Sequence, residues 1–288
     1  MNANNISRRE FGKRAAIAGA ALGALGLAGC AAPKKEATPI SIQLYTVREL
    51  TSQDFVGTLR KVAAIGYKAF EFAGYGDLTA KELKTLMDEL GVVCSGTHTG
   101  IQDMQNDLQA AIDFNLGLGT SNIVCPYMPG EFQQGGVEGY KKFAALLNEY
   151  GGPIKQAGMQ LSYHNHNFEF AKTDDGKYLY DVLLENTDPD LVKLEADLYW
   201  VKRAGLDPVE YMKTYADRLI MLHMKDMTAD DKHFFAPVGT GVMDFPAIIT
   251  AAREIGIEWF VVEEDRSQGD VMQDITVSFT NLNKMLNA

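Results

Sequence analysis

The chain has 288 residues, of which 46% are hydrophobic and 23% charged, and its formal net charge is −11. This composition is typical of a globular protein with one large domain. An acidic surface repels phosphate backbones, so nucleic acid is not expected as a partner.

Residues 1–30 have the pattern of a bacterial export signal. The paired Arg8 and Arg9 in SRREF precede a short run rich in alanine and glycine, which ends in LAGC at Cys30. A basic start followed by a short apolar stretch predicts a targeting segment, and the paired arginines resemble a twin-arginine signal. LAGC resembles a lipobox, in which Cys30 becomes the lipidated first residue. The uncharged run is too short to span a membrane comfortably.

Removal of residues 1–29 would take away four basic residues and one acidic residue, and would change the formal net charge from −11 to −14. We predict a tether over residues 31–38 and one domain over residues 39–288. The protein is expected in the periplasm or cell envelope, held to the membrane by its lipid alone. Cys94 and Cys125 lie in apolar runs and are predicted to be buried thiols, although export leaves a disulfide between them open.

Beyond residue 38, short apolar runs alternate with amphipathic helical stretches at the spacing of βα units. This pattern predicts a (β/α)8 TIM barrel. A doubly wound open sheet is the alternative, but it would normally carry a glycine-rich loop after its first strand, and QLYTVRELTSQD has none. The eight predicted strand runs are 40–46, 67–73, 92–98, 121–127, 159–166, 191–197, 219–226 and 258–265.

The helical stretches carry start and stop signals. Thr79 and Glu82 have the spacing of a capping box, and Asp207, which precedes a proline, and Asp244 can cap two later helices. The Gly-Gly-Pro triplet at residues 151–153 is expected to kink or split the helix before the fifth strand.

The segment LSYHNHNFEF at residues 161–170 contains two of the chain's five histidines, His164 and His166. Residues i and i+2 of a strand point to the same face, so the two imidazoles are expected to share a face. They could be metal ligands, an acid/base pair or polar filling. The other predicted strands also end in polar groups, which are Gln43, Tyr45, Glu71, His98, Glu195, Asp197, His223, Lys225, Asp226, Glu263, Glu264 and Asp265.

These strand ends predict a functional site. In TIM barrels the catalytic groups gather where the strands end, and a buried charge needs a partner or a metal ion. If Glu263 points into the barrel, Glu264 should point to the helical layer. His233 lies in a polar loop and is expected at the surface or in a lid.

The motifs YHNHNFEF, KLEADLYWV, HMKD and VVEED, in this order, resemble the sugar phosphate isomerase/epimerase-like family. This is the xylose isomerase-like TIM barrel group, which also contains inosose dehydratases, tagatose/psicose epimerases and endonuclease IV. QLYTVR and GTGVMDF also fit, and the resemblance covers most of residues 38–288. The ordered set is specific for the superfamily but not for a substrate.

The resemblance implies one divalent cation, held in most members by Glu, Asp, His and Glu from strands five to eight. Asp197, His223 and Glu263 match the last three positions, and His164 stands where the family usually has a glutamate. Trp200 stands where epimerases often have a histidine, which argues against a simple ketohexose epimerase.

The chemistry of these residues agrees with the resemblance. Carboxylates and imidazoles suit Mn, Co, Zn or Fe, and Mg stays open. Such a cation can stabilise the enediolate that forms when a proton next to a carbonyl leaves. Glu263 is a candidate for both ligand and base, and His166 and Lys225 are candidates for returning the proton.

Five further residues are expected to contact the substrate. Glu71 and Glu195 could instead neutralise Lys225, and an indole at residue 200 serves core packing as well as sugar stacking. The expected substrate contacts are Gln43, Glu71, His98, Glu195 and Trp200.

We therefore predict a metal-dependent isomerase or epimerase that acts on a keto- or hydroxy-carbohydrate. A lyase, such as a dehydratase or an enzyme that eliminates from a 3-keto glycoside, would use the same site. A non-catalytic sugar-binding lipoprotein is a further alternative. An endonuclease IV-like nuclease would need more histidines and a basic groove. The sugar, the metal and a homo-oligomeric state stay open.

Overall fold

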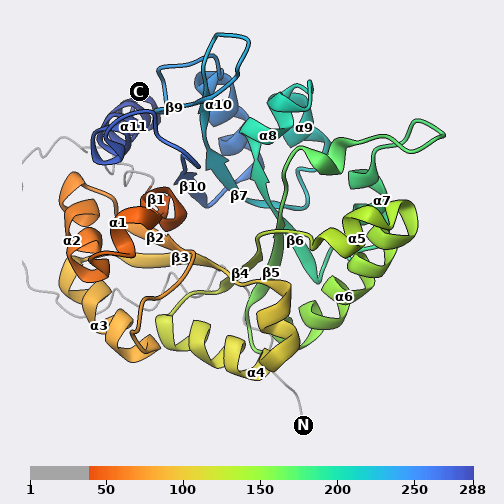
Figure 1. Cartoon of the computed structure of the whole chain (residues 1–288), viewed down its shortest axis with the longest axis horizontal. Helices are drawn as coiled ribbons and strands as arrows, with labels where there is room; N and C mark the ends of the chain where they lie inside the picture. The colour runs from red at the N-terminus through yellow and green to blue at the C-terminus, as the bar shows by residue number, and fades with distance from the viewer. Residues whose placement is uncertain (1–38) are drawn as a thin grey trace, which may run out of the picture. The chain divides into compact units, whose positions relative to one another are not determined.

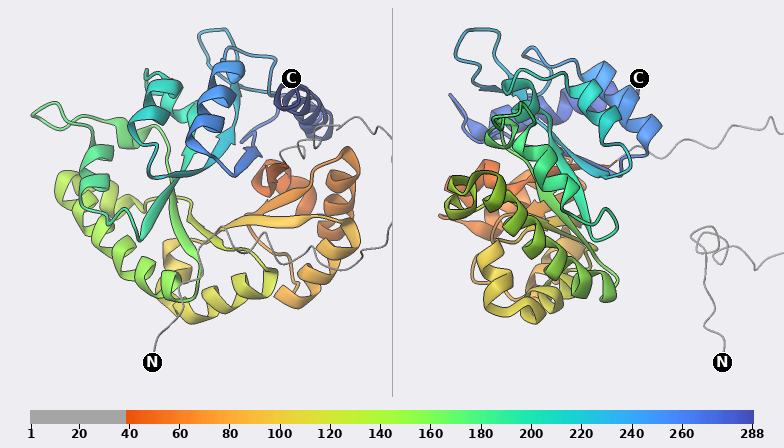
Figure 2. Two further views of the ribbon diagram at one scale, coloured as in Figure 1. Left: turned by 180° about the vertical axis from the view of Figure 1, so that it is seen from behind. Right: turned by 90° about the vertical axis from the view of Figure 1, so that its right-hand side faces the viewer.

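The computed structural model describes residues 39–288, so the predicted signal segment, the tether and Cys30 lie outside the described residues. Eight parallel strands close into a barrel in the order β1-β10-β7-β6-β5-β4-β3-β2. The strands lie inside and the helices lie around them (Figures 1 and 2). The predicted (β/α)8 barrel is confirmed, and the open doubly wound sheet was the wrong alternative.

Each predicted run contains one strand of the barrel. Several strands are shorter than their runs: after β1 the chain turns at once into a 3-10 helix, η2 (Leu44–Val47). The barrel strands are β1 (Ile40–Gln43), β2 (Ala69–Phe72), β3 (Val93–His98), β4 (Asn122–Cys125), β5 (Gln160–His164), β6 (Val192–Asp197), β7 (Leu219–Met224) and β10 (Trp259–Val262).

Helices connect the strands and pack against their outer side. None of the helices between residues 39 and 288 combines the length and apolar character needed to cross a membrane. They are α1 (Arg48–Thr51), α2 (Phe55–Ile65), α3 (Ala80–Leu90), α4 (Ile101–Leu118), α5 (Gly130–Gln134), α6 (Gly136–Gln156), α7 (Leu179–Glu185), α8 (Leu198–Arg203), α9 (Pro208–Thr214), α10 (Phe245–Ile255) and α11 (Val271–Leu286), with a second 3-10 helix, η3 (Phe168–Phe170).

The predicted helix caps are present. Thr79 and Glu82 form a capping box at the start of α3, and the carboxylates of Asp207 and Asp244 cap α9 and α10. Of the expected kink or split at residues 151–153, the split was wrong, because α6 continues through them. A side chain at residue 151 would clash with the backbone before β6, so its glycine lets the helix pack closely there.

A two-stranded hairpin follows β7. It consists of β8 (Asp226–Met227) and β9 (Phe235–Ala236). The buried carboxylate of Asp226 holds the loop beyond it by accepting four backbone N–H groups, those of Met227, Gly239, Gly241 and Met243. The ring of Phe235 stacks on Tyr199 with centroids 4.6 Å apart.

Cys94 and Cys125 are buried and free, as predicted for thiols in the strands. Burial raises the pKa of each thiol to about 12, so both stay protonated at neutral pH.

Candidate active site and metal centre

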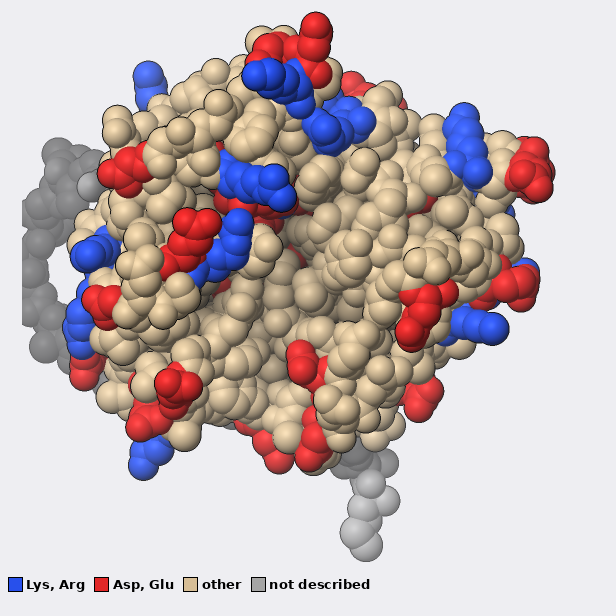
Figure 3. Space-filling model, in the orientation of Figure 1, with Lys and Arg blue, Asp and Glu red and all other residues tan. Residues whose placement is uncertain are grey.

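A cavity of about 410 Å³ lies at the carboxyl ends of the strands. In the view toward one end of the barrel, the molecular surface is hollowed near its centre (Figure 3). The cavity is lined by Tyr45, Ala73, His98, Pro126, Tyr127, His164, His166, Lys225, Glu263 and Asp265.

The strand register brings the four predicted ligands together. His223 on β7 pairs with Asp197 on β6 and with Val261 on β10. Glu263 follows Val261 by two residues and therefore lies on the same face as Val261. One donor atom from each of His164, Asp197, His223 and Glu263 lies within 4.8 Å of the others, and all four residues are buried. His223 Nδ1 is 2.6 Å from Glu263 Oε2, and His164 Nε2 is 3.7 Å from Asp197 Oδ2.

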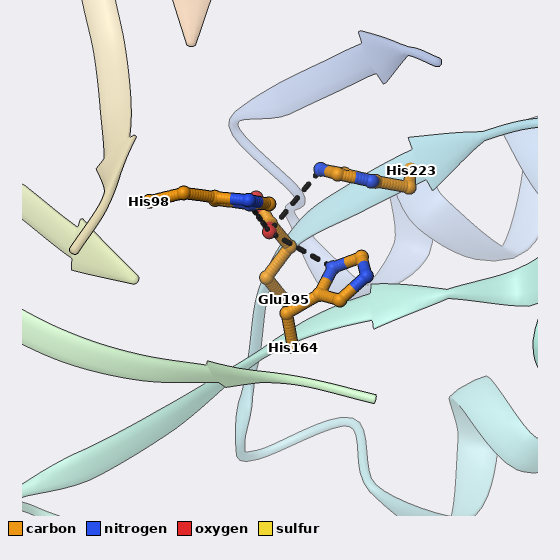
Figure 4. Close-up of side chains that lie close together, drawn as sticks. All are labelled: His98, His164, Glu195 and His223. Atoms are coloured by element: carbon orange, nitrogen blue, oxygen red, sulfur yellow. Dashed lines mark hydrogen bonds and ion pairs between the residues drawn. The ribbon is translucent and has the colours of Figure 1, made fainter. Parts of the chain in front are cut away.

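Glu195 lies beneath this cluster and contacts three imidazoles (Figure 4). Its Oε2 atom is 2.9 Å from His98 Nε2, 3.1 Å from His164 Nδ1 and 3.1 Å from His223 Nε2. His164 and His223 therefore turn one ring nitrogen toward Glu195 and the other toward Asp197 or Glu263. Carboxylates commonly orient metal-binding histidines in this way.

Gln43 and Glu71 extend the buried network. Gln43 Nε2 donates to Glu71 Oε2 at 2.8 Å, and the same oxygen lies 2.8 Å from His223 Nε2. Gln43, Glu71 and Glu195 are each 0% exposed and do not line the cavity. The positions of these three residues therefore do not favour their expected role as substrate contacts. His98 lines the cavity, so its position favours that role.

Lys225 is placed among three carboxylates. Its ammonium lies 2.7 Å from Asp197 Oδ2, 2.7 Å from Glu263 Oε2 and 2.6 Å from Asp265 Oδ1. The alternative that Lys225 neutralises Glu71 and Glu195 was wrong, because those two carboxylates contact histidines instead. Burial would lower the pKa of Lys225, but the three carboxylates raise it well above its usual value, so the ammonium stays charged.

His166 lies on the cavity wall just beyond β5, and its buried Nδ1 has no hydrogen-bond partner. Its backbone N–H donates to the buried Glu169 at 2.9 Å, and the hydroxyl of Tyr163 donates to the other Glu169 oxygen at 2.6 Å. Burial, and then the repulsion that a protonated His164 would exert, lower the pKa of His166 to about 2, so its imidazole is neutral. Its ring faces Trp200 at 5.7 Å between centroids.

The buried charges shift the pKa values of His223 and His164 in opposite directions. Burial would lower the pKa of His223, but Glu195, Glu263 and Glu71 raise it well above its usual value. Burial and then the charge on His223 lower the pKa of His164 to about 3. In the metal-free protein His223 therefore carries a proton and His164 does not.

This donor set fits a divalent cation. Two imidazoles and two carboxylates converge within 4.8 Å, and no thiol joins them among residues 39–288. Such mixed nitrogen and oxygen ligands suit Mn, Co, Zn or Fe. A second group, His98, His164, Glu195 and His223, is also close enough, but the buried glutamate already contacts all three imidazoles.

Glu264, His233 and Trp200 lie outside the cluster of predicted ligands. Glu264 is buried and does not line the cavity, and its backbone N–H donates to Thr46 Oγ1 at 3.1 Å, so it points away from the cluster as predicted. His233 is exposed in the hairpin loop and its carbonyl accepts from the Tyr199 hydroxyl at 2.6 Å. Trp200 is half-buried and its Nε1 has no partner.

Two tyrosines with large exposed surfaces flank the cavity and were not assigned a role from the sequence. Tyr45 is 44% exposed and Tyr127 is 48% exposed. Tyr127 ends the fourth predicted run, so the rule that strand ends carry function could have identified it. Glu169, by contrast, has no sequence signal, because only the turn after β5 brings it under His166.

A closed barrel with a cluster of polar and ionisable side chains at the carboxyl ends of its strands is the architecture of a TIM-barrel enzyme. The model of the xylose isomerase-like TIM barrel family matches residues 59–279, and the chain belongs to this family.

Similar proteins act in carbohydrate chemistry. A solved structure described as a sugar phosphate isomerase/epimerase from Parabacteroides distasonis is 27% identical, with a TM-score of 0.74 over 87% of this chain and 95% of that one. An inosose dehydratase of Lacticaseibacillus casei is 30% identical over 44% of this chain and 47% of its own length. An inosose dehydratase of Geobacillus kaustophilus is 32% identical over 39% of this chain and 41% of its own length. The chain thus spans less than half the length of these curated relatives.

Proposed function

We propose that this protein is a divalent-metal-dependent enzyme that isomerises or epimerises a keto- or hydroxy-carbohydrate by removing a proton next to a carbonyl group. The observation that carries the proposal is the convergence of four ligand-type side chains, of which His164 and Glu263 line a cavity that also holds His166 and Lys225. Titratable groups with displaced pKa values in a cavity mark functional sites.

The cation would be held by His164, Asp197, His223 and Glu263, and Mn, Co, Zn, Fe and Mg are the candidates. When bound, it would supply positive charge that stabilises the oxyanion formed as the proton leaves. Glu71 and Glu195 would orient the histidines from below, in place of the substrate contacts first expected of them.

Glu263 follows β10 and faces the cavity, so it could take a proton from one carbon of a bound sugar and return it to the neighbouring carbon. The neutral imidazole of His166, which follows β5, could hydrogen-bond the sugar from another part of the cavity wall. Lys225 keeps its proton and would instead offer a fixed positive charge to the developing oxyanion.

A dehydratase is the second candidate, and the curated relatives named inosose dehydratase favour it. It shares proton removal with the isomerase but then expels water. The buried ammonium and the histidines could assist a departing hydroxyl, so the two reactions use one site.

The test is incubation of the metal-loaded protein in D2O with a panel of neutral keto sugars and cyclitol ketones, followed by mass spectrometry. Incorporation of deuterium without loss of mass supports isomerisation or epimerisation, and loss of one water supports the dehydratase. The control is His233→Ala, since His233 is exposed in the hairpin loop. Sugar binding without exchange or mass loss would support the non-catalytic alternative.

We also propose that residues 1–30 direct export and that Cys30 carries a lipid, because the twin-arginine and LAGC motifs are both present. Changing Arg8 and Arg9 to lysine should leave precursor inside the cell, and Cys30→Ser should release the protein from the membrane fraction. Normal export of the double-lysine variant would refute the first statement, and membrane retention of the serine variant would refute the second.

A further inference from the structure

A second cavity adjoins the candidate active site. It has a volume of about 390 Å³, and it shares Ala73 and His98 with the first cavity of about 410 Å³. Pockets that bind small molecules measure about 300–1,000 Å³, so each cavity alone has room for a sugar ring. The two cavities lie side by side, with Ala73 and His98 in the lining of both, and we call them together the cleft.

One face of α4 forms much of the second cavity. The lining positions recur every three to four residues along this helix, on both sides of a kink at Asp107. They are Asp103, Asn106, Asp107, Ala110, Ala111, Phe114 and Asn115.

Tyr75 also lines the cavity, and its ring packs on that of Phe114 of α4 with centroids 4.3 Å apart. Both rings are only partly buried. Aromatic faces beside exposed carboxylate and amide groups suit a sugar, because rings pack on its C–H groups while oxygen atoms accept from its hydroxyls.

The charges of the cleft argue against a phosphorylated ligand. No lysine or arginine of residues 39–288 lines the second cavity, whose charged groups are the exposed Asp103 and Asp107. The first cavity offers Lys225, but its ammonium already contacts three carboxylates. A phosphate group in the second cavity would therefore meet like charges without a cation beside it.

We propose that the second cavity binds the second unit of a neutral two-unit carbohydrate, whose first unit lies at the metal centre. This inference rests on the proposed function, which places a carbohydrate in the first cavity. It adds that the substrate is a glycoside or disaccharide without phosphate.

The test fills the second cavity and leaves the first unchanged. Ala110 is exposed and lines the second cavity, so Ala110→Trp would occupy it, whereas Gln109→Trp adds the same side chain at a neighbouring exposed position that lines neither cavity. The metal-loaded variants are titrated calorimetrically with glucose, cellobiose, maltose and glucose 6-phosphate. If Ala110→Trp fails to fold by circular dichroism, Asn106→Trp replaces it.

We expect one disaccharide to bind the wild type at least about tenfold more tightly than glucose, which is about 1.4 kcal/mol. Ala110→Trp should remove this gain, and Gln109→Trp should retain it. Equal binding of glucose and both disaccharides, unchanged disaccharide binding in Ala110→Trp, or tighter binding of glucose 6-phosphate would each overturn the inference. Deuterium exchange into monosaccharides alone would retain the proposed function while this inference fails.

Discussion

Replacing Glu195 by glutamine tests how the buried network supports the metal centre. Glu195 Oε2 lies 3.1 Å from a ring nitrogen of each of two proposed ligands, His164 and His223. Glutamine has nearly the same shape, but its amide oxygen carries no negative charge, so the atom that faces the three imidazoles holds them less strongly. Losing such an orienting partner typically weakens metal binding about 10–100-fold. We expect the effect here near the upper limit, because one carboxylate supports two ligands.

Glu71→Gln is the matched comparison. Glu71 Oε2 contacts His223 at 2.8 Å, and His223 keeps Glu195 when Glu71 is changed. Its loss of affinity should therefore be smaller, nearer to tenfold. Both variants are titrated with Co²⁺ and Zn²⁺ by calorimetry after circular dichroism confirms the fold. Unchanged affinity in Glu195→Gln, or a larger loss in Glu71→Gln, would refute the reasoning.

His164→Ala should lose metal, whereas His166→Ala should keep metal and lose turnover; equal metal loss in both, measured by mass spectrometry, would show that the roles are divided wrongly. Burial raises the pKa of Glu169 from 4.5 to about 7, so its ionisation costs stability as pH rises between these values. Glu169→Gln should remove this cost, and in chelator its free energy of unfolding relative to the wild type should increase from pH 5 to pH 8; parallel pH curves would contradict this. Asp226→Asn should lower the free energy of unfolding by about 3 kcal/mol, because a charged acceptor of four backbone N–H groups is lost, and a denaturant midpoint equal to that of the wild type would count against it.

The alternating faces of strands explain why the sequence predicts the barrel and the cluster. His164, Asp197, His223 and Glu263 each stand at or just past the end of a strand, and parallel strands of a barrel end at one rim. The helix caps at Thr79 and Asp207 are local signals that need no tertiary information.

The depth of a side chain in the barrel and the register between strands are not local properties, and the sequence did not predict the partners of Glu195 and Lys225. Glu195 shares a face with Asp197 but lies two residues deeper, which places it under the histidines and out of the cavity. The register between β6 and β7 also shifts between Leu194 and Glu195, a change that no sequence pattern announces. The partners of Lys225 come from three strand ends that are distant in sequence, so only the closed barrel determines them.

The metal content of the purified protein tests the central claim most directly. Inductively coupled plasma mass spectrometry should find one divalent cation per chain in the wild type. The double variant Asp197→Asn/His223→Ala should contain none, while circular dichroism shows that its fold is retained. The same metal content in both proteins would contradict the proposed site.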